Sequence, residues 1–243
     1  MRIKVLFFCF VFWGINFLQA QELALPPRID LFQYNASEFT SLNMSEHPIA
    51  RIWGWSNNGK VAYSIEWDVD GRGGRMIDFV ILDLITDNKV FEQTIDSFGH
   101  DDYDGDYTFE DLFFMYNHVL SDALRANNIV LEQRNDFLPF PLRRNNITFN
   151  GHIIDVGHTR DEYGMFERVL SRYSILVTAD NRRKIIGNMI PVSRLTLDIY
   201  ISGYFLSPFE NRIMVVTTER AWGFEGSRFN YRFNGCHLGV GFN

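Results

Sequence analysis

The chain has 243 residues, of which 46% are apolar, 16% aromatic and 22% charged. This length and composition suffice for one ordinary hydrophobic core or two small ones, and they exclude a disordered chain. The net charge of −7 at pH 7, without a long basic run, makes nucleic acid or an anionic membrane surface a poor expected partner. Two cysteines exclude both a multi-disulfide scaffold and a four-cysteine zinc site.

Residues 1–20 have the pattern of an export signal. Arg2 and Lys4 precede a continuous apolar run from Val5 to Phe12, and Ala20 supplies a small residue at the expected cleavage position. The run is shorter than the ~20 residues that a membrane-spanning helix needs. A buried N-terminal helix is the alternative, but such a helix would show a polar face. We therefore expect a secreted or periplasmic bacterial protein with no transmembrane segment in the mature chain.

The export signal also bears on the cysteines. Cys9 lies inside the apolar run, too early to be a lipid-attachment cysteine, so Cys236 is the one thiol expected in the mature chain. A lone thiol in an oxidising compartment is usually buried. Alternating residues over 237–242 predict a C-terminal strand, and we expect Cys236 to be a core residue rather than a catalytic one.

The first half of the chain predicts a meander of about four antiparallel strands. Residues 21–47 contain Pro26-Pro27 and are expected to form an extended lead-in to a single β-rich domain over residues 48–243. The Asn57-Asn58-Gly59 turn lies between two apolar runs, which is a strong hairpin signal. The apolar segments lie at short spacing over residues 52–56, 61–67, 77–84 and 90–95.

One amphipathic helix is predicted over residues 108–126. Thr108 and Asp111 form a variant capping box, in which the acid is Asp rather than Glu. Apolar residues follow at intervals of three and four from Phe109 to Leu124. The opposite face is largely polar, so this helix should cover one face of a sheet.

The second half of the chain returns to strand patterns, over about residues 147–156, 171–178, 212–218, 229–233 and 237–242. Residues 160–170 are ambiguous, because Thr159 and Glu162 could cap a short helix that Gly164 would destabilise by about 1 kcal/mol. The whole pattern predicts a mainly β fold (β-rich α+β). It should consist of antiparallel meander sheets with at least one amphipathic helix packed on a sheet face.

Two turns suggest an internal repeat. Residues 54–63 (GWSNNGKVAY) and residues 205–215 (FLSPFENRIMV) both run from an apolar residue and a serine, through a tight turn, to a basic residue and an apolar strand. The turn resembles the WSPDG-type turn of TolB-like propeller blades, and the chain as a whole resembles secreted bacterial proteins. The resemblance implies one or two blade-like hairpins. The chain departs from that family because it lacks the four or more evenly spaced copies that a propeller needs.

The sequence contains no familiar motif for nucleophilic or phosphate chemistry. It has no Gly-x-Ser-x-Gly elbow, and the glycine-rich segment Gly71–Arg75 lies between strands rather than before a helix, which predicts a hairpin loop. His152 and His158 flank Asp155, but residues six apart on an extended strand are about 20 Å apart. They could share a zinc ion only if the strand bent sharply near Gly157. We expect surface or strand-end histidines.

Four tryptophans remain after the export signal: Trp53, Trp55, Trp67 and Trp222. Trp53 and Trp55 are expected on the same face of their strand, because side chains two residues apart point the same way. Burial of a large aromatic side chain is worth several kcal/mol, so a core role is the favoured interpretation. A surface platform that stacks on sugar rings is the alternative.

The densest charged feature is the segment from residue 100 to residue 111, with six carboxylates in eleven residues. Asp102, Asp104 and Asp106 alternate around Gly105. Short acidic loops with a glycine turn can supply the oxygen ligands of calcium, so these aspartates are a candidate calcium site. The segment departs from the EF-hand pattern, since His and Asp occupy the first and twelfth ligand positions. The alternative is a solvated turn whose acids favour the N-terminus of the following helix, by about 0.3–1 kcal/mol each.

These observations favour a non-enzymatic binding or interaction protein of the cell envelope, with a protein or glycan partner. No catalytic residue is assigned, and calcium is the only candidate cofactor. The alternatives are a secreted hydrolase whose site is assembled from separated loops and a carbohydrate-binding module that uses Trp53, Trp55 and Trp67. A polar cleft that holds titratable groups with displaced pKa values would favour an enzyme, whereas a flat or apolar patch would favour a binding protein.

Overall fold

Antiparallel strands dominate the structure, which is 59% strand and 10% helix. The mainly β prediction is therefore confirmed. The computed structural model describes residues 23–34, 47–69, 74–98, 107–132, 135–161, 164–223 and 226–243. Within these ranges no helix is both long enough and apolar enough to cross a membrane.

The first sheet, sheet A, is the predicted meander. Each of its four long strands pairs with the next along the chain, and a short later strand extends the sheet beside β1. The lead-in pairs with β1 through Ile29 and Ala50, and its Leu31 is buried. The strands of sheet A are β1 (Ile49–Trp55), β2 (Lys60–Val69), β3 (Gly74–Asp83), β4 (Asn88–Asp96) and β5 (Val130–Leu131).

Two further four-stranded meanders form the second half of the chain. Sheet B consists of β6 (Phe137–Leu138), β11 (Thr196–Leu206), β12 (Arg212–Gly223) and β13 (Gly226–His237). Sheet C consists of β7 (Leu142–Arg144), β8 (Ile147–Thr159), β9 (Val169–Ala179) and β10 (Arg182–Pro191). The sequence patterns indicated β8, β9, β12 and the middle of β13 but missed β6, β7, β10 and β11.

The predicted C-terminal strand over residues 237–242 is wrong. β13 ends at His237, and the chain turns at Leu238, where the backbone N–H donates to the Asn211 carbonyl (2.8 Å). The alternation that suggested a strand comes from glycines, and Gly241 has a φ of +81°, a conformation that favours glycine and a turn. The last residue, Asn243, then pairs with Arg183 at the edge of β10.

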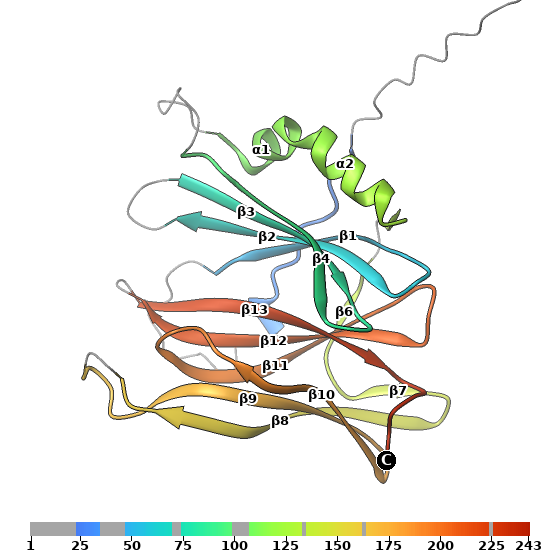
Figure 1. Ribbon diagram of the computed structural model, residues 1–243, viewed down its shortest axis with the longest axis vertical. Coiled ribbons are helices and arrows are strands. Elements are labelled where there is room, and N and C mark those ends of the chain that lie inside the picture. Colours follow the sequence, from blue (N-terminus) through green and yellow to red (C-terminus); the bar gives the residue numbers. More distant parts are fainter. Residues whose placement is uncertain are drawn as a thin grey trace, which may run out of the picture.

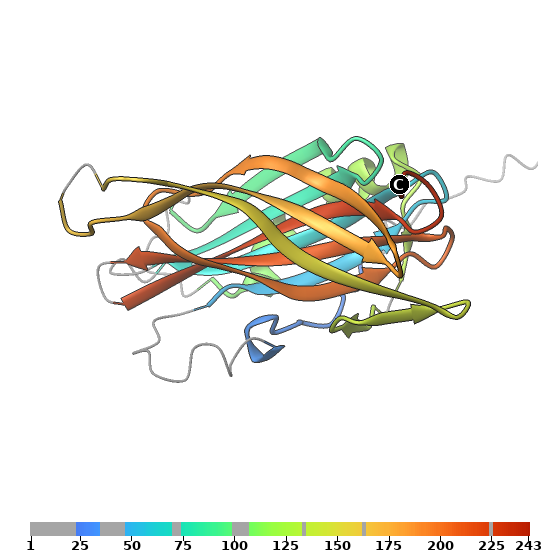
Figure 2. The ribbon, with the colours of Figure 1, turned by 90° about the horizontal axis from the view of Figure 1, so that it is seen from below.

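The three sheets stack face to face in the order A, B, C (Figure 1). Helices α1 (Phe109–Met115) and α2 (Asn117–Ala126) cover the face of sheet A that points away from sheet B. Sheet B is therefore enclosed on both faces, whereas no described helix or strand covers the outer face of sheet C (Figure 2). The layers follow the order helices, sheet A, sheet B, sheet C.

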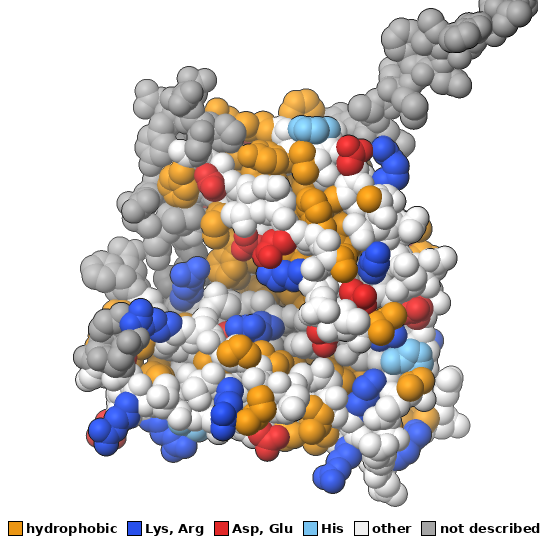
Figure 3. All heavy atoms as spheres, viewed as in Figure 1, with side chains coloured by type: hydrophobic (Ala, Val, Ile, Leu, Met, Phe, Trp, Pro, Cys, Tyr) orange, Lys and Arg blue, Asp and Glu red, His pale blue; other side chains and the backbone are white. Residues whose placement is uncertain are grey.

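Charge is divided unevenly between these layers. The described residues up to 132, which form the helices and sheet A, contain 12 Asp and Glu but only 6 Lys and Arg. The described residues from 135 onward, which form sheets B and C, contain 13 Lys and Arg but only 8 Asp and Glu. Basic side chains accordingly gather over the lower half of the molecule in Figure 3. The net negative charge is thus the sum of an acidic end, formed by the helices and sheet A, and a basic end, formed by sheets B and C.

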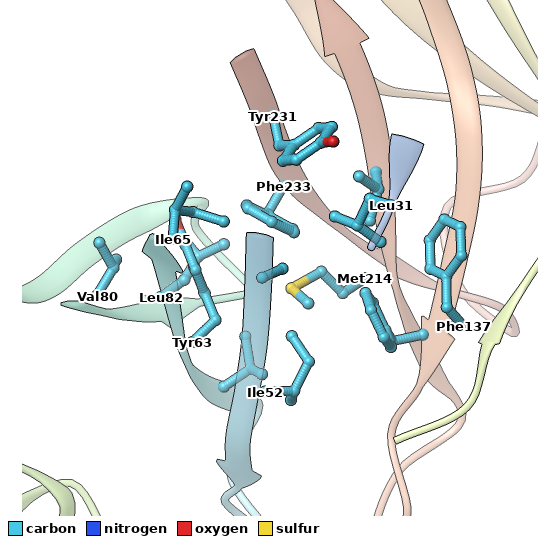
Figure 4. Packing of buried hydrophobic residues seen from close by; sticks show 14 of the residues in the cluster. Leu31, Ile52, Tyr63, Ile65, Val80, Leu82, Phe137, Met214, Tyr231 and Phe233 are labelled. Carbon is cyan, nitrogen blue, oxygen red and sulfur yellow. The ribbon is translucent and has the colours of Figure 1, made fainter. Parts of the chain in front are cut away.

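Separate apolar clusters fill the spaces between the layers. Between sheets A and B, Tyr63 packs against Phe233 with ring centroids 4.3 Å apart, next to Met214 (Figure 4). Strand β12 contributes side chains to two apolar clusters, because its side chains alternate between its two faces. Met214 and Val216 face sheet A, whereas Ile213 and Val215 belong to the cluster between sheets B and C.

The predicted helix forms as two short helices that meet at Tyr116. Its predicted start is confirmed: the Asp111 N–H donates to Thr108 Oγ1 (3.1 Å), and the Asp111 carboxylate accepts from the Thr108 N–H (2.8 Å). Phe109, Leu112 and Phe113 face sheet A and are buried. The apolar face of the helix pair therefore covers sheet A as expected.

A β-bulge changes where two tryptophans point. Trp53 packs in the cluster between sheet A and the helices, whereas Trp55 packs between sheets A and B. The prediction that Trp53 and Trp55 share a face is therefore wrong. The register of β1 shifts between Ile52 and Gly54, and the extra residue of a bulge reverses the alternation of side chains beyond it.

One stretch of chain crosses the edges of all three sheets. Beginning at Val130, it adds β5 to sheet A, β6 to sheet B and β7 to sheet C in turn. Two glycines allow its close approach: a Cβ on Gly54 would lie 2.1 Å from the Val130 carbonyl oxygen, and one on Gly203 would lie 2.4 Å from the Leu138 carbonyl oxygen. This crossing segment, residues 130–132 and 135–144, ties the stack together along one side.

The two turns that suggested a repeat occupy corresponding places in sheets A and B. Each is the tip of a hairpin, closed by bonds from Ser56 N–H to the Lys60 carbonyl and from Ser207 N–H to the Arg212 carbonyl. Arg212 also donates to the Leu84 carbonyl (2.9 Å), which joins the second hairpin to sheet A. The two tips are thus equivalent in position.

Candidate functional site

The predicted calcium site lies outside the described residues. Asp102, Asp104 and Asp106 all belong to this undescribed segment, so their geometry is not part of the structure. Of the described acids that follow, Asp111 caps α1 and Glu110 pairs with Arg51 (3.0 Å). Within the described ranges, no group of three or more His, Cys, Asp or Glu side chains is placed to hold a metal ion.

The two histidines on β8 contact different partners. The strand does bulge between Ile154 and Gly157, near the position where a shared zinc site would need a bend. However, His158 lies 2.8 Å from the Arg168 guanidinium, and His152 lies 3.3 Å from the Thr178 hydroxyl. Both histidines are exposed, in agreement with the expectation of surface histidines.

The tryptophan platform, the alternative to a core role, is not present at the surface of the described residues. Trp53 and Trp55 are 0% and 1% exposed. Trp67 is half-buried, with the Arg228 guanidinium 5.4 Å from its ring. Only Trp222, at 39% exposure, presents much of its ring. Burial of Trp53 and Trp55 confirms the core interpretation for these two residues.

The thiol within the described residues is also a core residue. Cys236 lies on β13 with 0% exposure, in the cluster between sheets B and C. Burial raises the pKa of its thiol to about 11. Since the thiolate is the reactive form, Cys236 has the properties of an inert buried cysteine.

A cavity with a partly apolar lining lies beside α1. This groove, which we call the α1 groove, has a volume of about 540 Å³ and lies between the helix and the lead-in, above Trp53. Trp53 and Phe113 meet edge to face with centroids 5.1 Å apart and form its aromatic floor. The lining residues are Leu23, Ala24, Leu25, Trp53, Glu110, Asp111, Phe113, Phe114 and Asn117.

A buried charged network holds both walls of the α1 groove. Arg51 on β1 is 4% exposed and pairs with Glu66 on β2, which is 2% exposed. The same guanidinium donates to the Pro26 carbonyl (2.5 Å) in the lead-in and to Glu110 (3.0 Å) on α1. Arg28 adds a second ion pair to Glu66 (3.0 Å). A single arginine thus links the lead-in wall to the helix wall.

Electrostatics give the rim of the α1 groove a negative character. Hydrogen bonds from the Thr108 hydroxyl and N–H hold the pKa of Asp111 below its usual range, so its carboxylate is ionised at neutral pH. Glu110 is 57% exposed at its side chain and lies at the same rim. The groove therefore combines an aromatic floor with two carboxylates at its mouth.

Sequence reasoning found the groove's apolar residues but not the network behind it. Trp53 and Phe113 follow from strand and helix patterns, whereas Arg51 and Glu66 are charged residues inside apolar strand segments. Such residues on a strand with two covered faces must find partners. This interruption of the apolar pattern is the signal that could have identified them.

A smaller cavity of about 350 Å³ lies where β8, β9 and the β10–β11 connection meet. Ser193 lines it and donates through its N–H and hydroxyl to the buried carboxylate of Glu219 (3.2 Å each). Glu219 is also paired with Arg232, and Asn230 donates to the Ser193 hydroxyl (3.1 Å). These contacts fix the β10–β11 turn around a buried acid.

Comparison of the chain with known proteins gave no match to a protein family, a curated protein or a solved structure. The fold and the site define the class: a mainly β protein of three stacked antiparallel meanders with an acidic aromatic groove beside its helices. The function is therefore inferred from the residues of this chain alone.

Proposed function

We propose that the protein is a non-enzymatic binding protein of the bacterial cell envelope and that the α1 groove binds a segment of a partner protein. The α1 groove itself is the observation that carries this proposal. A preformed, mainly apolar cleft with a few fixed polar groups is the usual form of a ligand site. The Arg51 network preorganises the cleft because it holds both walls before any ligand arrives, and preorganisation lowers the cost of binding.

The lining indicates the chemistry of the partner segment. The exposed Phe114 and the half-buried Leu23 and Leu25, above the buried rings of the floor, favour an apolar or aromatic side chain. Glu110 and Asp111 favour a positive charge beside it, because opposite charges across an interface steer association and fix register. The preferred segment therefore carries Lys or Arg next to a large apolar residue.

The test is a selection from a random peptide library displayed on phage, followed by measured affinities of the selected peptides. We expect the selected peptides to share a basic residue adjacent to an aromatic or aliphatic one. Phe114→Ala should weaken binding about tenfold or more, since an exposed aromatic anchor in an interface is typically worth over 1 kcal/mol. Glu110→Gln should lower the affinity for basic peptides and leave the affinity for their uncharged analogues unchanged.

Asp122→Asn is the matched control. Asp122 lies on α2, is exposed at 72% of its side chain and pairs with Arg125 (3.0 Å), but it does not line the α1 groove. Its replacement removes the same charge from the helical layer and should leave the affinities unchanged. Selected peptides without a basic residue, or equal losses in the groove and control variants, would contradict the proposal.

A further inference from the structure

The outer face of sheet C is a second surface, independent of the α1 groove. Tyr173, Ile175 and Val177 on β9 face sheet B and are buried, so the alternate residues of β9 point outward. Pairing register then places rows of side chains across the uncovered face (Figure 2). From β8 through β9 to β10 the rows are Asn150, Thr178 and Arg183, then His152, Leu176 and Ile185. In the third row Ile154 pairs with Ser174, which is buried where its hydroxyl accepts from the Met189 N–H in the β10 bulge (3.0 Å).

Arginines border this face at both ends. Arg172 continues the outward positions of β9 and lies opposite Gly157, and Arg183 ends the first row. Arg143 on β7 lies opposite Thr148 on β8. All three arginines are exposed. In the described residues from 142 to 195 there are nine Lys and Arg but four Asp and Glu. Two carboxylates lie on these strands or their turns: Asp155, in the β8 bulge, and Asp180, which accepts from the Thr148 N–H (3.3 Å).

Aliphatic side chains are exposed among these arginines. Ile185 is 51% exposed, and Met189 and Val156, in the bulges of the two flanking strands, are 43% and 40% exposed. Leu176 and Ile154 are half-buried beside them. A sheet face with exposed aliphatic residues and bordering arginines can place apolar groups at the headgroup level while its cations meet phosphates.

We propose that the outer face of sheet C docks on an anionic phospholipid bilayer. The net charge of −7 would oppose docking if it were spread evenly, but among the described residues the excess of acidic over basic side chains lies in the helices and sheet A. This separation of acidic from basic residues orients the molecule at an anionic surface, because the surface repels the helical end and attracts sheet C. A pair of copies stacked through this face would set arginines against arginines, which disfavours a second copy as the occupant.

Vesicle co-sedimentation tests the proposal with the full chain. Vesicles of phosphatidylcholine with about one third phosphatidylglycerol should bind the protein at low salt, and pure phosphatidylcholine should bind it weakly. Reversal of two arginines, Arg172→Glu with Arg183→Glu, should reduce binding by a factor of ten or more, at about fivefold per cation near the surface. Ile185→Ser should weaken binding severalfold at unchanged charge.

Arg125→Glu is the matched charge reversal at the opposite end. Arg125 is 78% exposed at its side chain on α2, and its replacement should leave vesicle binding unchanged. Binding that survives reversal of Arg172 and Arg183 would overturn the proposal, as would equal losses in the Arg125 variant. Sedimentation of the protein without vesicles as a reversible oligomer, abolished by the double reversal, would instead identify a second copy as the occupant and would equally overturn it.

Discussion

At the scale of single residues, burial controls the chemistry of Cys236. A thiol reacts through its thiolate, and burial raises the Cys236 pKa to about 11. We expect folded protein that carries Cys9→Ser to resist a thiol reagent such as Ellman's reagent at pH 8. Reaction should be complete only after denaturant is added. Rapid reaction of the folded protein would show that β13 opens readily or that the thiol is accessible.

Single residues also show what the sequence could and could not predict. Cys236 and Trp55 were identified as core residues from composition and alternation alone. The opposite orientations of Trp53 and Trp55 were not, because a one-residue bulge at Gly54 is set by the approach of Val130. Contact between residues so distant in sequence leaves no local pattern. The partners of Arg51 were hidden for the same reason, since Pro26, Glu66 and Glu110 lie far apart along the chain.

At the scale of elements, the capping box of α1 should support the helix measurably. Thr108→Ala removes a side-chain cap and should lower the free energy of unfolding by about 1 kcal/mol at pH 7. Chemical denaturation monitored by circular dichroism checks this value. Because α1 forms one wall of the α1 groove, the same variant should also weaken the binding of any ligand in that groove.

The acid of the capping box gives this prediction a pH dependence. Thr108 lowers the pKa of Asp111 in the folded state, so the ionised carboxylate stabilises the fold above the ordinary carboxyl pKa. That contribution is lost as the pH falls through the lowered pKa. Asp111→Asn should therefore destabilise the protein at pH 7 but have little effect near pH 2. A difference in the free energy of unfolding between the unmodified protein and Asp111→Asn that stays constant with pH would refute this assignment.

Among the elements, locally encoded ones were predictable and assembly-dependent ones were not. The strands of sheet A follow from apolar alternation and from the Asn57–Gly59 turn, and the helix start follows from Thr108 and Asp111. β10 was missed because its apolar pattern is interrupted by Gly187 and by the positive φ of Met189. The two-residue strands β5 and β6 exist only because the crossing segment meets the edges of sheets that are already formed.

At the scale of the whole molecule, stacking order and charge separation are properties that composition does not contain. The net charge of −7 argued against an anionic surface, yet the fold collects the basic residues into sheets B and C. The walls of the α1 groove, likewise, come from the lead-in, β1 and α1. Both candidate surfaces therefore depend on how distant segments are brought together.

The shared position of sheet B predicts that the stack unfolds as one unit. Met214 and Ile213 are neighbours on β12, both 0% exposed, and they face sheets A and C respectively. Met214→Ala and Ile213→Ala should each destabilise the protein by about 2–5 kcal/mol, the usual cost of such truncations in a core. Each variant should shift a single transition, seen equally by tryptophan fluorescence and by far-ultraviolet circular dichroism.

Comparison of these two variants distinguishes one cooperative transition from the alternative for a stack of layers, in which sheet C unfolds before sheets A and B. The described tryptophans lie on β1, β2 and β12, so their fluorescence reports sheets A and B, whereas circular dichroism reports all three sheets. If sheet C unfolded first, the circular dichroism transition of Ile213→Ala would precede its fluorescence transition. In Met214→Ala the two transitions would coincide. Coincident curves in both variants require that β12 and the crossing segment couple all three sheets, since neither cluster could then be lost without the other.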